Sequence, residues 1–340
     1  MNKKIIEYKN PIYLAHDHMS RYEDLLQDKT AGVSGKILHL TVDGWIDAPT
    51  RSLYNETYNT YDGFFERYIS ALDKLENIIN SHSDLFKLIK KHSDLIVAKT
   101  ENKLAIILGN EGGKIIGENL ENFDYLYKSG LRHIQFNWSM KNNLSACQED
   151  ENSSSDTGLT QYGKILIEKM NESGMIIDIS HSSPKTIKEV LDITTKPILN
   201  SHSGSRSLAN KKQNLWDYQI KELSDNNGIL AIHFCSRLVL GDNYKQASII
   251  DVVKQIKYVK KIGGIDIIAL GPDWILGDKE RDKKYTHNTN QENISWTKNL
   301  ENSKDIKNII RPLESEGFTE REIDSILYKN MERFLNSVFL

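Results

Sequence analysis

PIYLAHDHMS, at residues 11–20, is an apolar run that ends in two histidines separated by one residue. Such a run, bounded by proline and serine, is typical of a buried β-strand. Residues i and i+2 of a strand point to one face with Cα atoms about 6.5 Å apart, so His16 and His18 can bind one metal ion. The alternative is that one histidine points inward while the other caps a turn. Asp17 faces the opposite way, which indicates a supporting or structural role.

Similar apolar runs recur along the chain, and helical patterns separate most of them. The predicted strands are 11–16, 36–42, 104–109, 132–138, 175–180, 197–201, 228–235 and 266–271. The clearest predicted helices are 59–81, 160–174, 184–193 and 249–264. Eight strands that alternate with helices over this length predict a (β/α)8 TIM barrel, which we expect to form a single domain over residues 1–340. Functional residues then belong at the carboxyl ends of the strands.

Four further strand ends carry metal-ligand or acid–base residue types, namely Glu111, His181, His202 and Asp273. A buried carboxylate at Glu111 is costly unless it is paired or binds metal, and a carboxylate can bridge two cations. His181 and His202 are flanked by serines, so the alternative is incidental histidines beside helix caps. Asp273 is placed to orient metal-bound water or accept its proton, with a surface turn as the alternative. The other histidines are interpreted as core or solvated residues: His39, His82, His92, His133, His233 and His287.

The composition excludes several classes of partner. The 340 residues are 39% hydrophobic and 27% charged with a net charge of −3, and mixed Lys and Glu give no basic patch for nucleic acid. No stretch of 18 apolar residues predicts a membrane span, and the start MNKKIIEYKN lacks a signal-peptide core. Cys147 and Cys235 form no disulfide framework, so we expect a reducing, cytoplasmic location. Residues 277–303 are polar and are predicted to form a long loop that serves as a lid or pocket wall.

The order of these segments resembles the membrane (renal) dipeptidase family, metal-dependent hydrolases of the amidohydrolase-like TIM barrel type with two zinc ions. The resemblance is carried by LAHDH, ILGNEGG, GLTQYGKILIEKMNESGMIIDISHSS, KPILNSHSGSRSL, IGGIDIIALGPDW and GFTEREIDSILYKNMERFL. VDGWID at 42–47 also resembles the first motif, with Trp45 in place of histidine. If it formed strand one, residues 48–103 would have to supply strand two, yet they read mainly as helix. We therefore place strand one at the 16–18 motif.

The resemblance implies two zinc sites that share Glu111. One would be completed by His16 and His18, and the other by His181 and His202. A metal-bound hydroxide would attack the amide carbonyl of a dipeptide or similar small amide, and Asp273 would pass a proton to the leaving nitrogen. Nitrogen and oxygen ligands also accept Mn, Co or Fe. Members of the family often form dimers, so the resemblance also implies a homodimer.

Three positions depart from the family pattern. His18 stands where the family usually has aspartate, which keeps a ligand but removes a negative charge. Trp138 replaces a substrate-binding histidine, and an indole donates one hydrogen bond but does not titrate. Gln213 and Asn214 replace an arginine-containing pair that grips the dipeptide carboxylate, and glutamine cannot form the charged bidentate contact. Nearby cations that could take over this role are Arg206, Lys211 and Lys212.

Three functions follow as hypotheses. The first is a zinc-dependent hydrolase that acts on a dipeptide or another small amide. The second, based on Trp138 and Gln213, is a relative that tailors a specialised metabolite or modified peptide. The third is a catalytically silent metal-binding protein. Asp273 counts against the third, because a structural zinc site is closed and four-coordinate and needs no additional carboxylate.

Overall fold

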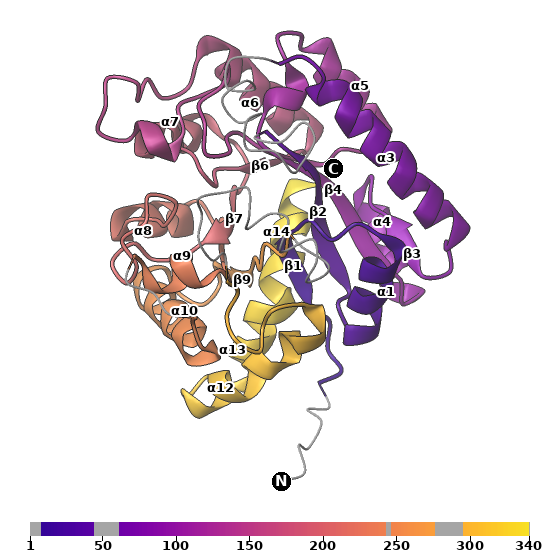
Figure 1. The fold of residues 1–340 in the computed structure, drawn as a ribbon, viewed down its shortest axis with the longest axis vertical. Helices are drawn as coiled ribbons and strands as arrows, with labels where there is room; N and C mark the ends of the chain where they lie inside the picture. Colours follow the sequence, from indigo (N-terminus) through magenta and orange to yellow (C-terminus); the bar gives the residue numbers. More distant parts are fainter. Residues whose placement is uncertain (1–7, 44–60, 243–245, 276–294, 340) are drawn as a thin grey trace.

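The computed structural model describes residues 8–43, 61–242, 246–275 and 295–339, and Figure 1 shows their arrangement. All of the paired strands run parallel, in the order β3-β4-β2-β1-β9-β8-β7-β6-β5. The strands are β1 (Tyr13–Asp17), β2 (Gly35–Val42), β3 (Phe86–Leu88), β4 (Leu104–Glu111), β5 (His133–Gln135), β6 (Ile176–Asp178), β7 (Leu199–Ser203), β8 (Ile229–Ile232) and β9 (Ile268–Leu270).

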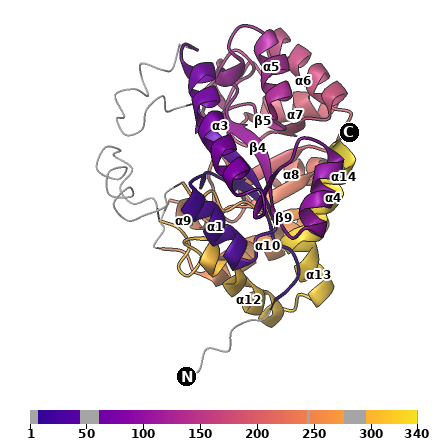
Figure 2. The same ribbon diagram turned by 90° about the vertical axis from the view of Figure 1, so that its right-hand side faces the viewer.

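Helices follow most strands and surround them, as Figure 1 and Figure 2 show from two directions. Their bounds are α1 (Tyr22–Ala31), α3 (Phe64–Ser81), α4 (His92–Thr100), α5 (Glu121–Ser129), α6 (Gln161–Ser173), α7 (Pro184–Ile193), α8 (Asp217–Asp225), α9 (Ser236–Leu240), α10 (Ile249–Gly263), α12 (Ile310–Ser315), α13 (Glu320–Asp324) and α14 (Asn330–Val338). Four short 3-10 or π turns lie at Lys114–Ile116, Gln148–Asp150, Ser303–Ile309 and Ser325–Lys329.

The predicted helices are confirmed where capping signals are strongest. α7 occupies the predicted residues 184–193, with the hydroxyl of Ser183 accepting a hydrogen bond from the N–H of Thr186 at 3.1 Å. α6 begins after Thr160, whose hydroxyl accepts from the N–H of Gly163, and ends at Gly174 with φ 68°. The helix predicted over 59–81 begins at Phe64 in the structure, and residues 59 and 60 lie outside the described residues.

The barrel closes because two strands, β3 and β5, pair with the same edge of β4 at different points along its length. Its first half pairs with β3, and Ile89 N donates to Ile106 O at 2.9 Å just beyond that strand. Further along the same edge, Arg132 N donates to Leu108 O at 3.0 Å and brings β5 alongside. The predicted (β/α)8 fold is confirmed, but the strand count needs a correction. β3 is an additional short strand that the sequence pattern did not indicate.

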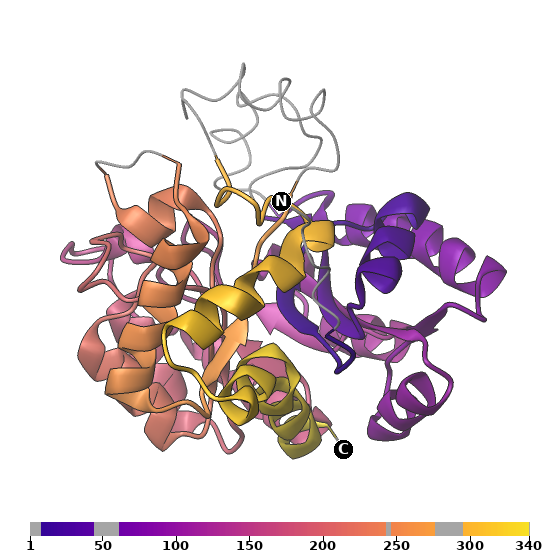
Figure 3. The same ribbon diagram turned by 90° about the horizontal axis from the view of Figure 1, so that it is seen from below.

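Alternation along the strands divides the apolar side chains into two layers. On β2, Leu38 packs outward against the helices, whereas Ile37 points into the barrel. The inner layer continues into α14, whose Phe334 and Leu335 are fully buried in the same cluster. Figure 3 shows this C-terminal segment between the two halves of the molecule. α14 therefore contributes to the inner apolar layer of the barrel.

Two expectations concern segments that the structure covers only in part. Most of the loop predicted at 277–303, including His287, and the Trp45 motif beyond Asp43 lie outside the described residues. Within the described ranges, none of the helices is long and apolar enough to cross a membrane.

Candidate metal centre

Strand ends bring together every histidine and carboxylate that the sequence singled out as a ligand or catalyst. His16 and His202 lie within β1 and β7, Glu111 is the last residue of β4, and His181 and Asp273 follow β6 and β9. These five are at most 9% exposed, and the sixth, His18, directly follows β1 and is half-buried. Their side chains converge at the carboxyl end of the barrel, as expected for this fold.

The pairing of β1 is irregular just before His18, which directly follows the strand. Leu14 pairs with Lys36 and Asp17 with Leu38, so β1 contains one residue more than β2 between these pairs. The Nε2 atoms of His16 and His18 lie 3.1 Å apart, which agrees with the shared orientation predicted for them. Asp17 points away from the centre and forms a buried ion pair with Lys36, so its predicted opposite orientation is also confirmed.

The last strand completes this motif through its backbone. Asp273 N donates to the carbonyl of His16 at 3.1 Å, and His18 N donates to the carbonyl of Trp274 at 3.2 Å. Asp273 adopts φ 55° and His181 adopts φ 63°, both in the left-handed region that non-glycine residues rarely occupy. Such backbone strain is concentrated at functional sites, where the surrounding structure holds it.

Glu111 lies between two pairs of histidines. Its Oε1 lies 3.2 Å from Nε2 of His181 and 3.4 Å from Nε2 of His202. Its Oε2 lies 3.2 Å from Nε2 of His18 and 4.0 Å from Nε2 of His16. Each carboxylate oxygen therefore faces its own pair of imidazole nitrogens, which is the arrangement needed for a carboxylate that bridges two cations.

The turn after Glu111 is held by Asp43 at the end of β2. Both carboxylate oxygens of Asp43 accept from the N–H of Lys114, at 3.0 and 3.2 Å. Gly112 has φ 103°, and a Cβ atom there would lie 2.1 Å from the Asp43 carboxyl carbon. The glycine is therefore required both for the backbone angle and for the close approach that fixes the end of β4.

The hydrogen bond of His18 to a backbone carbonyl determines which of its ring nitrogens faces the centre. Its Nδ1 lies 3.1 Å from the carbonyl oxygen of His39, which can only accept, so the ring hydrogen belongs on Nδ1. In the neutral ring, the lone pair of Nε2 then faces His16, Glu111 and Asp273. Burial alone lowers the pKa of His18, but hydrogen bonds to Asp273 and Glu111 raise this pKa to about 10. The surroundings thus favour a positive charge, either a proton or a metal ion, at this point.

One carboxylate oxygen of Asp273 is held by a hydrogen bond, and the other faces the histidines of the centre. Its Oδ1 lies 3.3 Å from Nε2 of His18 and 3.5 Å from Nε2 of His16. Its Oδ2 lies 3.0 Å from Nε2 of His233, whose Nδ1 accepts from the N–H of Cys235 at 2.7 Å. The ring hydrogen of His233 is therefore on Nε2 and is donated to Asp273. Burial raises the pKa of Asp273, but the hydrogen bonds from His18 and His233 lower it more, so the group is ionised.

His233 is the residue of this centre that sequence reasoning missed. The run 228–235 was taken as one strand with His233 in its interior, whereas β8 ends at Ile232. His233 therefore follows a strand end, in the same way as the predicted site residues. His39 and His133, predicted as core or solvated residues, are buried, and the ring of His39 stacks on that of His16 at 3.6 Å.

Two of the three predicted substrate-binding residues, Gln213 and Asn214, lie beside the second histidine pair. Gln213 and Asn214 line a cavity of about 10 Å³ together with His181. Gln213 Nε2 donates to the carbonyl of His202 at 3.0 Å, whereas both amide hydrogens of Asn214 are used by the carbonyls of Ala209 and Leu238. Trp138 is half-buried, and the hydroxyl of the next residue, Ser139, is 3.5 Å from Nδ1 of His181.

The cations proposed to replace the missing arginine all have acidic partners. Arg206 Nη1 lies 2.8 Å from Glu151, and its guanidinium stacks 4.2 Å above the ring of Trp216. Lys212 lies 3.2 Å from Glu149, and Lys211 pairs with Asp242. Their charges are thus partly neutralised within the protein.

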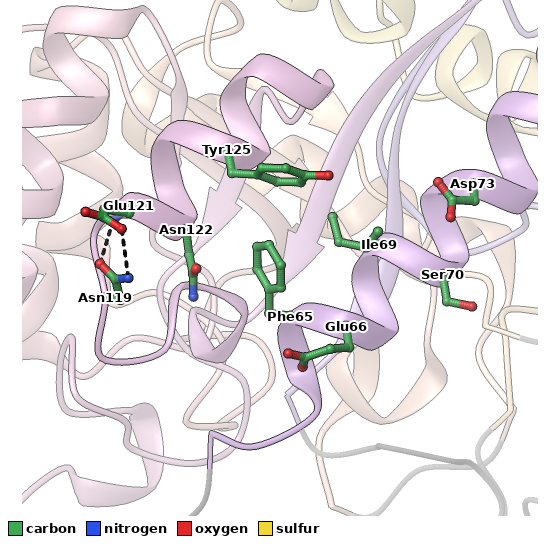
Figure 4. A pocket seen from close by; sticks show the side chains of 9 residues that line it. All are labelled: Phe65, Glu66, Ile69, Ser70, Asp73, Asn119, Glu121, Asn122 and Tyr125. Carbon is green, nitrogen blue, oxygen red and sulfur yellow. Dashed lines mark hydrogen bonds between the residues drawn. The ribbon is translucent and has the colours of Figure 1, made fainter.

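A larger groove, of about 640 Å³, lies outside the barrel between α3 and α5. Figure 4 shows Phe65 and Tyr125 across it, with Glu66 and Asp73 on the α3 side. None of the predicted site residues lines this groove, so it is separate from the metal centre.

The fold is a parallel barrel, and its carboxyl end carries a buried cluster of histidines and carboxylates. This combination is typical of metal-dependent hydrolases. The family model for membrane dipeptidase (peptidase family M19) matches residues 39–339, which is most of the chain. The chain belongs to this family of metallopeptidases.

Relatives by sequence include dipeptidase tcpJ of Claviceps purpurea, 26% identical over 267 residues, which are 78% of this chain and 59% of that protein. An uncharacterized dipeptidase of Schizosaccharomyces pombe is 28% identical over 208 residues, covering 61% of this chain and 50% of the relative. The chain thus spans about half to three-fifths of the length of these relatives.

Solved structures show the same fold at low identity. An amidohydrolase from Pseudomonas aeruginosa is 20% identical with a TM-score of 0.80, and 96% of each chain is covered. The metallopeptidase dipeptidase AC is 14% identical with a TM-score of 0.81, covering 98% of this chain and 99% of the other.

Proposed function

We propose that this protein is a hydrolase that uses two metal ions to cleave the amide bond of a dipeptide or similar small amide. Zinc is the metal that we expect first. The observation that carries the proposal is the position of Glu111, whose two carboxylate oxygens face separate pairs of imidazole nitrogens at 3.2–4.0 Å. The names of the dipeptidase relatives support the substrate class.

The chemistry of the donor set fits a metal. His16 and His18 would hold one ion with Glu111, and His181 and His202 the other. The inner nitrogens of His181 and His202 lie 3.0 Å apart, so the second pair repeats the geometry of the first. When bound, the two ions would activate water near neutral pH and polarise the amide carbonyl. Neutral imidazole and carboxylate donors also accept Mn, Co or Fe.

Proton transfer is assigned to Asp273. Its depressed pKa keeps it ionised, so it accepts a proton from the attacking water through Oδ1 and delivers it to the leaving nitrogen. His233 holds Oδ2 and prevents the carboxylate from rotating away. Trp138, Gln213 and Asn214 would form the wall that contacts the substrate. A closed structural zinc site would not need this additional carboxylate, which argues against a catalytically silent protein.

A second candidate, a relative that tailors a modified peptide or specialised metabolite, is favoured by the charges around Gln213. Arg206, Lys211 and Lys212 each have an acidic partner, and Gln213 itself donates to a backbone carbonyl. These four residues would therefore suit a substrate that lacks a free carboxylate at this position. We also propose that the protein forms a homodimer and is located in the cytoplasm. The two cysteines, both buried and unpaired, are consistent with a reducing compartment.

The test is a hydrolysis screen with protein that has been stripped by chelation and reloaded with zinc, manganese, cobalt or iron. The panel contains L,L and L,D dipeptides and the same dipeptides with an amidated carboxyl end. We expect about two ions per chain and metal-dependent cleavage that the Glu111→Gln variant lacks. Preference for the amidated compounds would select the second candidate. Fully loaded protein that cleaves nothing in the panel, or protein that binds no metal, would overturn the proposal.

A further inference from the structure

A buried hydroxyl on β7, Ser201, contacts one histidine from each half of the centre. Its Oγ lies 2.9 Å from Nδ1 of His16 and 3.0 Å from Nδ1 of His202. Ser201 is completely buried, as are both histidines. These are the outer ring nitrogens, which face away from Glu111, so the hydroxyl supports both rings from behind.

The direction of each hydrogen bond follows from the groups at the far end of the network. Asp178, on β6, is fully buried and can only accept while it is ionised; burial raises its pKa, but hydrogen bonds such as that from His133 lower the pKa below its usual value. The hydroxyl of Ser180 donates to Asp178 Oδ1 at 2.7 Å and so uses its single hydrogen. The contact of 3.2 Å between the hydroxyls of Ser180 and Ser201 must then be donated by Ser201.

With its hydrogen used in this way, Ser201 can only accept from the two histidines. A serine hydroxyl has two lone pairs, one for each Nδ1–H. Both rings are therefore held in the tautomer that carries hydrogen on Nδ1 and leaves the lone pair of Nε2 directed at the centre. This is the tautomer that a metal ion needs from an Nε2 ligand, and an acceptor behind the ring also makes that nitrogen more basic.

We propose that Ser201, supported by Ser180 and Asp178, is a positioning residue that sets the tautomer of His16 and His202 together. The inference rests on the proposed metal centre but not on the substrate. One hydroxyl thereby serves both metal sites, so its loss weakens both of them. Removing an outer-sphere partner of a ligand commonly lowers metal affinity by about 10- to 100-fold.

Ser203 provides a matched control. It lies two residues further along β7, is 1% exposed, and its hydroxyl has no hydrogen-bond partner in the described part of the chain. Ser201→Ala and Ser203→Ala therefore remove the same atom from the same strand, but only the first removes hydrogen bonds to ring nitrogens.

The first experiment titrates metal-free protein with zinc against a chromophoric chelator. We expect affinity at both sites to fall about 10- to 100-fold in Ser201→Ala and to stay within about threefold of wild type in Ser203→Ala. Equal affinity in the two variants, or weakening at only one of the two sites, would overturn the inference. A wild-type protein that binds none of zinc, manganese, cobalt and iron would instead overturn the proposed function, and the inference with it.

The second experiment requires no substitution. Nitrogen-15 NMR of the histidine rings in the metal-free wild-type protein reports the tautomer of each imidazole. We expect His16 and His202 to carry hydrogen on Nδ1. A ring of either histidine that carries hydrogen on Nε2 and none on Nδ1 would contradict the assignment even if the Ser201→Ala variant failed to fold.

Discussion

Lys36 offers the sharpest test of what holds the first histidine motif in place. Its ammonium group is completely buried on the outer face of β2 and pairs with Asp17 and with Asp28 Oδ2, the latter at 2.6 Å. It also donates to the carbonyl of Met19 at 2.9 Å. Lys36→Met keeps the apolar stem but leaves two buried carboxylates without their cation.

The expected cost follows from burial. Removing one partner of a buried ion pair costs about 3–5 kcal/mol, because the remaining charge is left uncompensated in a medium of low dielectric constant. Since whole domains are stable by only about 5–15 kcal/mol, this loss is a large fraction of the total. With a urea dependence of about 3 kcal/mol per M, the unfolding midpoint should fall by about 1 M or more.

The assay is urea unfolding of the metal-free protein, so that metal binding does not contribute. Lys188→Met is the control, because Lys188 pairs with Asp192 on the exposed surface of α7 and its loss should change the midpoint little. Adding Asp17→Asn and Asp28→Asn to Lys36→Met should recover part of the stability by removing the unpaired charges. Equal midpoints for Lys36→Met and Lys188→Met would refute the reasoning.

The remaining predictions concern the site itself. His181→Ala and His202→Ala should each lose one metal ion and nearly all hydrolysis while circular dichroism shows an intact barrel; full activity in either would remove that residue from the centre. Asp273→Asn should keep both ions but lower turnover by about 100-fold or more, whereas loss of metal together with activity would make it a ligand. Gln213→Arg should lower KM for simple dipeptides by about 10- to 100-fold, as one charged hydrogen bond to a carboxylate allows, and unchanged dipeptide kinetics would contradict this role.

Much of the barrel could be predicted because the apolar runs and helix-capping residues of the sequence agree with the strands and helices of the structure. Eight strands were recognised as apolar runs, and α7 was bounded correctly by Ser183 and Pro184. β3 was missed because Phe86–Leu88 is three residues long with two partly exposed side chains, too short for alternation to show. The single-domain assignment stays a prediction.

The site could be predicted as far as residue types at strand ends reveal it. The shared orientation of His16 and His18 was predicted from strand geometry. In the structure β1 also contains a bulge, which the sequence pattern did not predict. His233 was missed because an error of three residues in the end of β8 placed it inside a strand. The partners of Gln213 depend on loops that meet only in three dimensions, so sequence spacing carried no information about them.

The backbone contacts between the first and last strands have a consequence for synthesis of the protein. Leu14 pairs with Leu270, and the carbonyl of His16 accepts from Asp273, so a motif that is synthesised early is completed by one that follows more than 250 residues later. Contacts between such distant parts of a chain make folding slow and leave partly folded intermediates exposed. Before β9 is made, the proposed ligands His16, His18, Glu111, His181 and His202 lack the backbone and side-chain contacts of Asp273. The complete set of site residues is therefore brought together only after β9 has been made, and the order of synthesis places Asp273 last among them.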